Sequence, residues 1–173
     1  MTLNINGILT PHLPYIVYII SSLDPDILTL HDIRLTRKSA YFVVRWLAQA
    51  LAPGTWVKAF LSPNVIPYRR KGNQGGLRHS SGGQLIIVTP SWAGAVTSSS
   101  TDPSGLAILS TITIASVPPT LIVSGYWPHA VNGLNPFSNS LAARLLRYLN
   151  TVDPSAIPQY IHSQLHSLLD SDI

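Results

Sequence analysis

Two short apolar segments near the N-terminus each end directly on polar residues, and this pattern constrains the fold more than any other feature. The first segment runs from Thr2 to Ile5 and ends at Asn6-Gly7. The second runs from Ile27 to Leu30 and ends at His31-Asp32. Segments of this length are typical of strands, and the apolar residues between them recur at helical spacing over 13–23. The start of the chain therefore predicts a strand, a helix and a second strand, with the helix packed on a sheet.

The rest of the chain shows the same mixture of strand and helix patterns. Strands are expected at 55–61, 84–89, 106–115 and 120–125, and helices at 38–51, 138–149 and around the apolar stripe of 157–168. The serine-rich segment 98–105 ends in Asp-Pro-Ser-Gly and is predicted to form a turn. Pro118-Pro119 separates the last two strands, which predicts a hairpin. This order favours an α/β sandwich over a doubly wound parallel sheet.

The length and composition indicate one domain. With 173 residues, 46% of them hydrophobic, the chain can bury one sizeable core, and its 10% charged residues are few for a free-standing soluble domain. No apolar run approaches the roughly 20 residues of a membrane-spanning helix, and no basic region precedes an apolar run at the N-terminus. We therefore expect no membrane contact and an intracellular location.

The ionisable residues limit the available chemistry. The chain has no cysteine, which excludes disulfides and thiolate zinc sites, and all seven acidic residues are Asp. His162 and His166 lie one helical turn apart without a third ligand, so we expect polar surface residues there. A net charge of +4 and a pI near 9.6 suit a polyanionic partner, although such a balance is also common in proteins that have none.

Three segments together resemble a known superfamily. They read Asn4-Ile5-Asn6-Gly7, His31-Asp32-Ile33 and Tyr126-Trp127-Pro128-His129. In this order they are similar to motifs of the endonuclease/exonuclease/phosphatase superfamily, most of all the apurinic/apyrimidinic-type endonuclease domain of LINE-type retrotransposons. The resemblance implies a four-layer α/β/β/α sandwich over 1–173, Mg²⁺ (or Mn²⁺) as cofactor, DNA as partner and a nuclear location.

The resemblance also implies roles for single residues. Asn4 would orient the scissile phosphate, Tyr126 would lie beside it, and His129 stands where the family has Asn. Asp32 stands where the family has a metal-binding Glu. Because Asp is shorter by one methylene, roughly 1.5 Å of reach, metal binding can survive while turnover is lost. Without the resemblance these are ordinary residues: a turn former, a packing aromatic and a carboxylate that caps a loop.

Several polar and basic residues are predicted to contact nucleic acid. Asn6 lies within the first motif, and Arg34 directly follows the second. The glycine-rich segment 67–83 adds basic side chains that suit phosphate contacts, namely Arg69, Arg70, Lys71 and Arg78. The alternative for this segment is a solvated surface loop.

Two further motifs of the superfamily, Gly-Asp-x-Asn and Ser-Asp-His, do not occur in the sequence. We therefore expect a truncated domain with little activity alone, because catalytic groups of this kind act as a unit. Strand edges left without partners favour self-association. Two alternatives stay open: a non-catalytic module of this fold that binds nucleic acid or protein, and a superfamily member that acts on a lipid or small phosphate ester.

Overall fold

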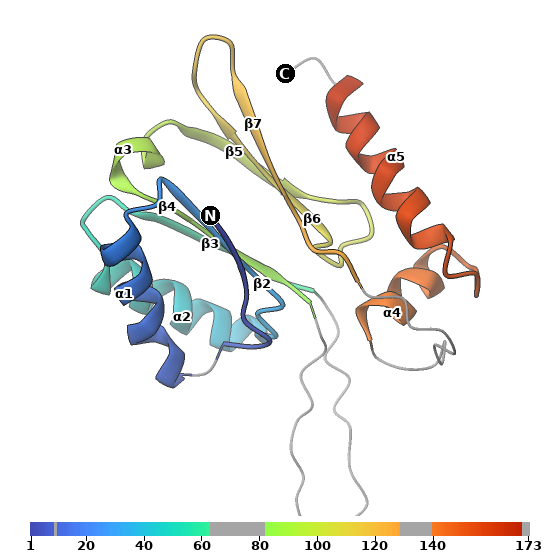
Figure 1. Ribbon diagram of the computed structural model, residues 1–173, viewed down its shortest axis with the longest axis horizontal. Helices are drawn as coiled ribbons and strands as arrows, with labels where there is room; N and C mark the ends of the chain where they lie inside the picture. The colour runs from blue at the N-terminus through green and yellow to red at the C-terminus, as the bar shows by residue number, and fades with distance from the viewer. Residues whose placement is uncertain (9, 63–81, 129–139, 171–173) are drawn as a thin grey trace, which may run out of the picture.

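Two β-sheets lie between two groups of helices (Figure 1). The computed structural model describes residues 1–8, 10–62, 82–128 and 140–170. The first sheet has the order β1 (Thr2–Asn4), β2 (Ile27–His31), β4 (Gln84–Val88), β3 (Trp56–Phe60), and the second has the order β5 (Val96–Thr101), β6 (Leu109–Ile114), β7 (Thr120–Gly125). The helices are η1 (Thr10–His12), α1 (Leu13–Leu23), α2 (Arg37–Ala50), α3 (Pro90–Ala93), α4 (Leu141–Tyr148) and α5 (Ala156–Asp170).

The strand directions bring several chain ends to one edge of the first sheet. β1 pairs in parallel with β2, so that Asn4 lies opposite His31. β4 runs antiparallel to β2 and β3, and its first residue, Gln84, is opposite both His31 and Phe60. The carboxyl ends of β1 and β2 and the start of β4 therefore meet at one place.

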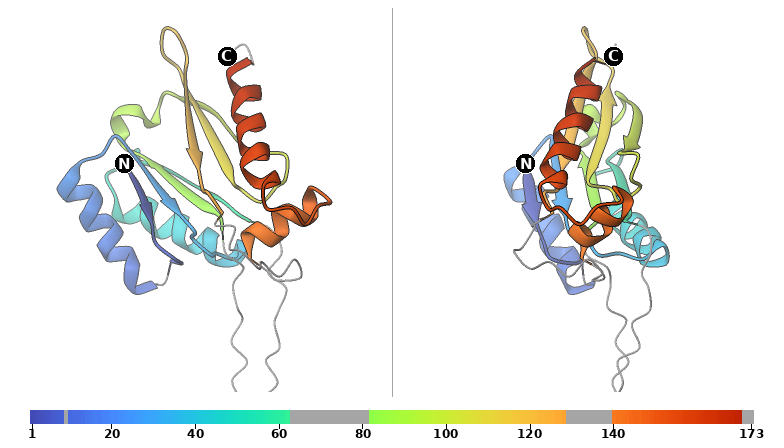
Figure 2. Two further views of the ribbon diagram at one scale, coloured as in Figure 1. Left: turned by 45° about the vertical axis from the view of Figure 1, so that its right-hand side comes forward. Right: turned by 90° about the vertical axis from the view of Figure 1, so that its right-hand side faces the viewer.

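Apolar side chains fill the spaces between four layers. The outer face of the first sheet packs on α1 and α2 through residues such as Leu28, Leu30, Leu13 and Leu47. Between the sheets lie Phe60, Ile86, Val88, Ile112 and Ile114. On the other side α4 and α5 pack on the segment before β6 and on Leu109, which Figure 2 shows as a layer beside the second sheet. This arrangement confirms the predicted α/β/β/α sandwich, and each fully buried aliphatic side chain contributes roughly 1.5–3 kcal/mol to it.

Local signals explain why the helices end where they do. α1 occupies the predicted range, and its C-cap Asp24 has a left-handed φ of 42° just before Pro25. α2 begins one residue before the predicted start, where Thr36 and Ser39 form a capping box. None of the helices in the described ranges combines the length and apolar character needed to cross a bilayer.

The prediction of a turn over 98–105 is wrong for its first half. Residues Val96–Thr101 form the edge strand β5, and the chain turns only after Thr101. Serine hydroxyls support this strand by bonding across to β6: Ser98 donates to Thr113 at 2.9 Å, and Ser100 pairs with Thr111 at 2.7 Å. A serine run therefore reads as a turn in the sequence, although it can equally line an exposed strand whose partner carries threonines.

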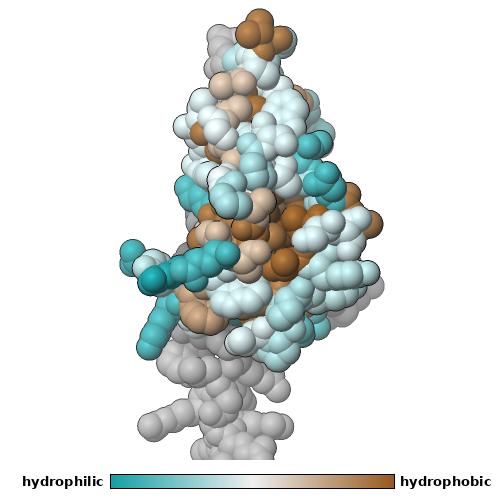
Figure 3. Space-filling view, turned by 90° about the vertical axis from the view of Figure 1, so that its left-hand side faces the viewer, coloured by the Kyte–Doolittle hydropathy of each residue, from teal (hydrophilic) through white to brown (hydrophobic). Residues whose placement is uncertain are grey.

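Strand β1 ends the first sheet, so its outer edge has no neighbouring strand in the described part of the chain. A groove of about 350 Å³ runs beside it, lined mainly by apolar residues of β1, α1 and β2, among them Leu3, Ile5, Ile16 and Ile19. Figure 3, which faces the side of α1, shows apolar side chains gathered on this surface. Self-association through this edge stays a prediction.

Candidate functional site

Three residues predicted from the sequence meet at one end of the sandwich. Asn4 is the last residue of β1, Asp32 follows β2 directly, and Tyr126 follows β7 directly. Asn4 lies opposite His31, whose ring meets that of Tyr126 edge to face with centroids 5.9 Å apart. The pKa of Tyr126 responds to the charge of Asp32 and to the side chain of Asn4. The structure therefore brings these three side chains into one cluster. The third predicted catalytic residue, His129, lies outside the described residues.

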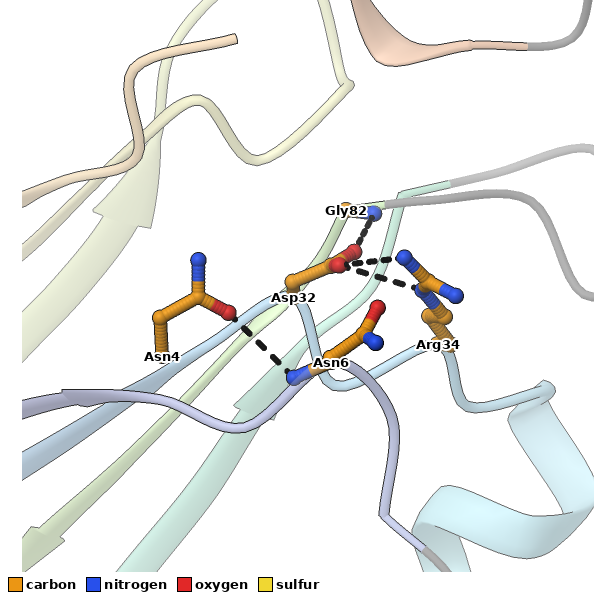
Figure 4. A network of polar contacts seen from close by, with 5 residues as sticks. All are labelled: Asn4, Asn6, Asp32, Arg34 and Gly82. Carbon is orange, nitrogen blue, oxygen red and sulfur yellow. Dashed lines mark hydrogen bonds and ion pairs between the residues drawn. The ribbon is translucent and has the colours of Figure 1, made fainter. Parts of the chain in front are cut away.

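Asp32 is buried and held from two directions (Figure 4). Its side chain is 4% exposed. Oδ1 accepts a hydrogen bond from the main-chain N–H of Gly82 at 2.6 Å. Oδ2 accepts hydrogen bonds from Nε and Nη2 of Arg34 at 3.1 and 2.7 Å. Both Asp32 and Arg34 have a left-handed φ, 57° and 51°, so the chain curls tightly between them. This curl lets a side chain two positions later reach back to the carboxylate.

Arg34 is the exposed side of this pair. Its side chain is 36% exposed, whereas that of Asp32 is almost completely buried. A guanidinium has five N–H donors, and the bonds to Asp32 use two of them. The remaining donors can bind a phosphate oxygen, which is compatible with the predicted nucleic-acid contact.

The oxygen donors of the site are of the kind that Mg²⁺ prefers, with the carboxylate of Asp32 next to the amide of Asn4. Three hydrogen bonds already reach that carboxylate, and the guanidinium of Arg34 stands where a cation would bind Oδ2. Within the described ranges, no three His or Asp side chains gather in a way that could hold a metal. These residues could hold an ion only with one carboxylate, water and phosphate as ligands, and only after Arg34 has moved away from Oδ2.

Tyr126 is a hydrogen-bond donor at neutral pH. Burial raises the pKa of its phenol, and the charge of Asp32 raises it further. Arg34 and the side chain of Asn4 lower this pKa. The protonated hydroxyl can donate to an oxygen that gains negative charge during reaction.

A chain of buried polar residues, two of them absent from the sequence prediction, lies behind the cluster. His31 Nε2 is 3.0 Å from Ser124 Oγ, and that hydroxyl donates to Gln84 Oε1 at 2.6 Å. Gln84 Nε2 in turn donates to the carbonyls of Ala107 and Ile108, both at 2.9 Å. Burial lowers the pKa of His31, so its imidazole is neutral at pH 7. In the sequence, Gln84 and Ser124 could have been noticed only as polar residues within two largely apolar strands.

The other predicted contacts divide into two groups. Asn6 is exposed, has a φ of 49° and donates its main-chain N–H to Asn4 Oδ1 at 3.2 Å, so it lies at the mouth of the cluster. The basic residues of 67–83 fall outside the described residues, namely Arg69, Arg70, Lys71 and Arg78. His162 and His166 lie next to each other on α5, with ring centroids 4.5 Å apart, and both are exposed as predicted.

Comparisons with known proteins find distant matches among solved structures. No protein-family model and no curated protein matches the chain. Among solved structures, the 3′ phosphatase NExo from Neisseria bound to a product DNA hairpin is 16% identical with a TM-score of 0.44, covering 73% of this chain and 40% of that one. An endonuclease/exonuclease/phosphatase from Beutenbergia cavernae is 18% identical with a TM-score of 0.44 and coverages of 88% and 43%. The Xenopus laevis APE2 catalytic domain is 14% identical with a TM-score of 0.48 and coverages of 92% and 54%.

This chain spans between 40% and 54% of the length of these solved structures. At such identities and TM-scores the likeness says nothing about activity. The chemistry of the site therefore rests on the residues that this chain itself brings together, and the LINE-type assignment stays a prediction.

Proposed function

We propose that this chain carries the phosphate-binding part of a Mg²⁺-dependent phosphodiesterase that nicks DNA, as the endonucleases of LINE-type retrotransposons do. The observation that supports this most is the convergence of Asn4, Asp32 and Tyr126 from the ends of three strands. A carboxylate, an amide and a protonated phenol at one point form a group suited to a phosphodiester. The exposed guanidinium of Arg34 adds positive charge at the same point.

Each side chain has a distinct role in this proposal. The amide of Asn4 and the hydroxyl of Tyr126 donate hydrogen bonds to non-bridging oxygens of the phosphate. Asp32 holds the divalent ion, which when bound stabilises the negative charge of the transition state. Arg34 moves from Asp32 to the phosphate, so that its positive charge contacts the substrate.

The described site contains no general base in this proposal. The superfamily motifs that would provide one, Gly-Asp-x-Asn and Ser-Asp-His, do not occur in the 173 residues. We therefore expect the chain alone to bind metal and DNA and to nick DNA weakly or not at all.

Binding and nicking are measured separately to test the proposal. Mn²⁺ binding followed by electron paramagnetic resonance should show one site that is lost in Asp32→Ala and kept in Asp153→Ala, an exposed carboxylate. Anisotropy of a labelled DNA duplex should show binding that Mg²⁺ strengthens, weaker in Asn4→Ala and Tyr126→Phe. His162→Ala, on α5, is the matched control for DNA binding. The proposal would be overturned if the site variants kept both Mn²⁺ binding and DNA binding. Rapid plasmid nicking by the chain alone would refute the expectation that the chain is inactive.

The pairing of Asp32 with Arg34 favours a second candidate function. A carboxylate already neutralised by a guanidinium at 2.7 Å has less need of a metal. In this alternative the chain is a non-catalytic module that binds nucleic acid through Arg34. DNA binding that is unchanged by Mg²⁺ and by Asp32→Ala, and abolished by Arg34→Ala, would support it over the first.

A further inference from the structure

The hydrogen bonds behind the cluster have only one possible direction. The carbonyls of Ala107 and Ile108 can only accept, so the group of Gln84 that lies 2.9 Å from both must be its NH₂. The other atom of that amide, Oε1, then faces Ser124 and accepts its only hydroxyl proton. Ser124 Oγ is left as an acceptor for His31. The fixed carbonyls therefore determine every proton along the chain.

This direction determines the tautomer of His31. The nitrogen that lies 3.0 Å from Ser124 Oγ, Nε2, must carry the proton, because Ser124 has none left to donate. In a neutral imidazole the other nitrogen, Nδ1, then has a free lone pair. The tautomer follows from the protein's own backbone rather than from a choice between equivalent ring orientations.

The same bond crosses between the sheets beside a hollow. On the side of β1 and β7 a hollow of about 330 Å³ separates the sheets, and its lining includes Thr2, Thr29, His31 and Ser124. His31 directly precedes Asp32, and Ser124 lies two residues before Tyr126. The ring of His31 also meets that of Tyr126 edge to face, with centroids 5.9 Å apart.

We propose that His31 is a positioning residue: its Nε2–H bond to Ser124 ties the end of β2 to the end of β7 and so sets the place of Tyr126 relative to Asn4 and Asp32. A misplacement of about 1 Å at such a site can cost on the order of 10²-fold in rate. His31 contacts neither phosphate nor metal in this proposal. Only one readout of its test rests on the proposed function.

Two amide substitutions with different reach test the proposal. His31→Gln places an NH₂ group near the position of Nε2, whereas the amide of His31→Asn stops roughly 1.5 Å short of it. Ser124→Ala removes the acceptor from the other side. We expect nuclear Overhauser contacts between the Tyr126 ring and the Asn4 side-chain amide in wild type and His31→Gln, and their loss in His31→Asn and Ser124→Ala. Dispersed amide spectra of all variants establish that they fold.

The wild-type imidazole gives an independent readout. Long-range ¹H–¹⁵N spectra at pH 8 should show a protonated Nε2 and an unprotonated Nδ1 for His31. The opposite tautomer would overturn the proposal, as would Tyr126–Asn4 contacts that persist in His31→Asn and Ser124→Ala. In DNA binding we expect about a tenfold loss for His31→Asn and recovery in His31→Gln, a difference of about 1.4 kcal/mol. If the wild-type chain does not bind DNA, the proposed function fails, and the two spectroscopic readouts still decide the role of His31.

Discussion

Two buried aspartates of this protein accept hydrogen bonds from different kinds of donor. Asp32 is 3% exposed and Asp102 is 7% exposed, and each follows the last residue of a strand. Asp102 accepts only from neutral donors, which are the main-chain N–H groups of Ser104, Ile108 and Leu109 and the hydroxyls of Ser104 and Tyr160. Asp32 accepts hydrogen bonds from one main-chain N–H and from a charged guanidinium.

The difference separates a carboxylate that holds the fold from one that is available for chemistry. Asp102 closes the turn after β5 and anchors Tyr160 of α5, whose pKa is raised by burial and by this hydrogen bond. Its five donors come from four residues that the fold fixes in place. Most of the interaction of Asp32 comes from one side chain that is 36% exposed. A cation or a phosphate can compete for that side chain.

Replacing each aspartate by alanine should give the largest contrast. Asp102→Ala leaves several buried donors without an acceptor, and we expect it to lower the free energy of unfolding by about 4 kcal/mol. Asp32→Ala leaves Gly82 N–H unpaired, while Arg34 can turn to water, so we expect a loss of about 1–2 kcal/mol. Urea unfolding with m-values measures both.

The milder pair Asp102→Asn and Asp32→Asn protects this comparison if Asp102→Ala does not fold. An amide keeps one acceptor oxygen and should preserve the ranking at smaller magnitude. Equal losses for the two positions would show that Asp32 is as structural as Asp102. The comparison would then no longer identify the functional carboxylate.

Removing the guanidinium should make Asp32 a better metal ligand. In Arg34→Gln the ion no longer competes with a cation that lies 2.7 Å from Oδ2. We expect Mn²⁺ to bind about tenfold more tightly, equivalent to about 1.4 kcal/mol. Arg45→Gln, on the exposed face of α2, removes the same charge elsewhere and is the matched control. An equal gain in Mn²⁺ affinity in both variants would mean that the effect comes from net charge alone. Weaker Mn²⁺ binding in Arg34→Gln would mean that Arg34 helps to hold the metal.

The parts of this fold that depend on local signals were predictable from the sequence. Leu13–Leu23 shows helical spacing up to the Asp24-Pro25 break, and the helix has these bounds. The strands around Pro118-Pro119 form the predicted hairpin. The grouping of Asn4, Asp32 and Tyr126 came from a resemblance of motifs, because spacing along a chain does not show which strand ends meet.

The parts that depend on distant partners were not predictable. Gly82 donates to Asp32 across 50 positions, and Ser124 bonds His31 across 93. The sequence around Gly82 and Ser124 contains no pattern that predicts these distant partners. The turn predicted for the serine run of β5 was wrong for the same reason, since the threonines that pair with these serines lie on another strand. A single sequence contains the polar residues but not the pairing that distinguishes Asp102 from Asp32.

The smallest effect concerns the strand that leads into Asp102. Ser100 lies on β5, and its hydroxyl pairs with that of Thr111 at 2.7 Å. We expect Ser100→Ala to lower the free energy of unfolding by about 0.5 kcal/mol, typical of a cross-strand hydroxyl pair, and Ser100→Thr to restore it. Thr101→Ala, on the same exposed strand, controls for the loss of a hydroxyl in general. Because Asp102 fixes the end of β5 through five bonds, its substitution by Asn should cost several times more than that of Ser100. If the two losses are equal, the hydroxyl pairs hold β5 in place, and Asp102 is no more an anchor of the fold than Asp32.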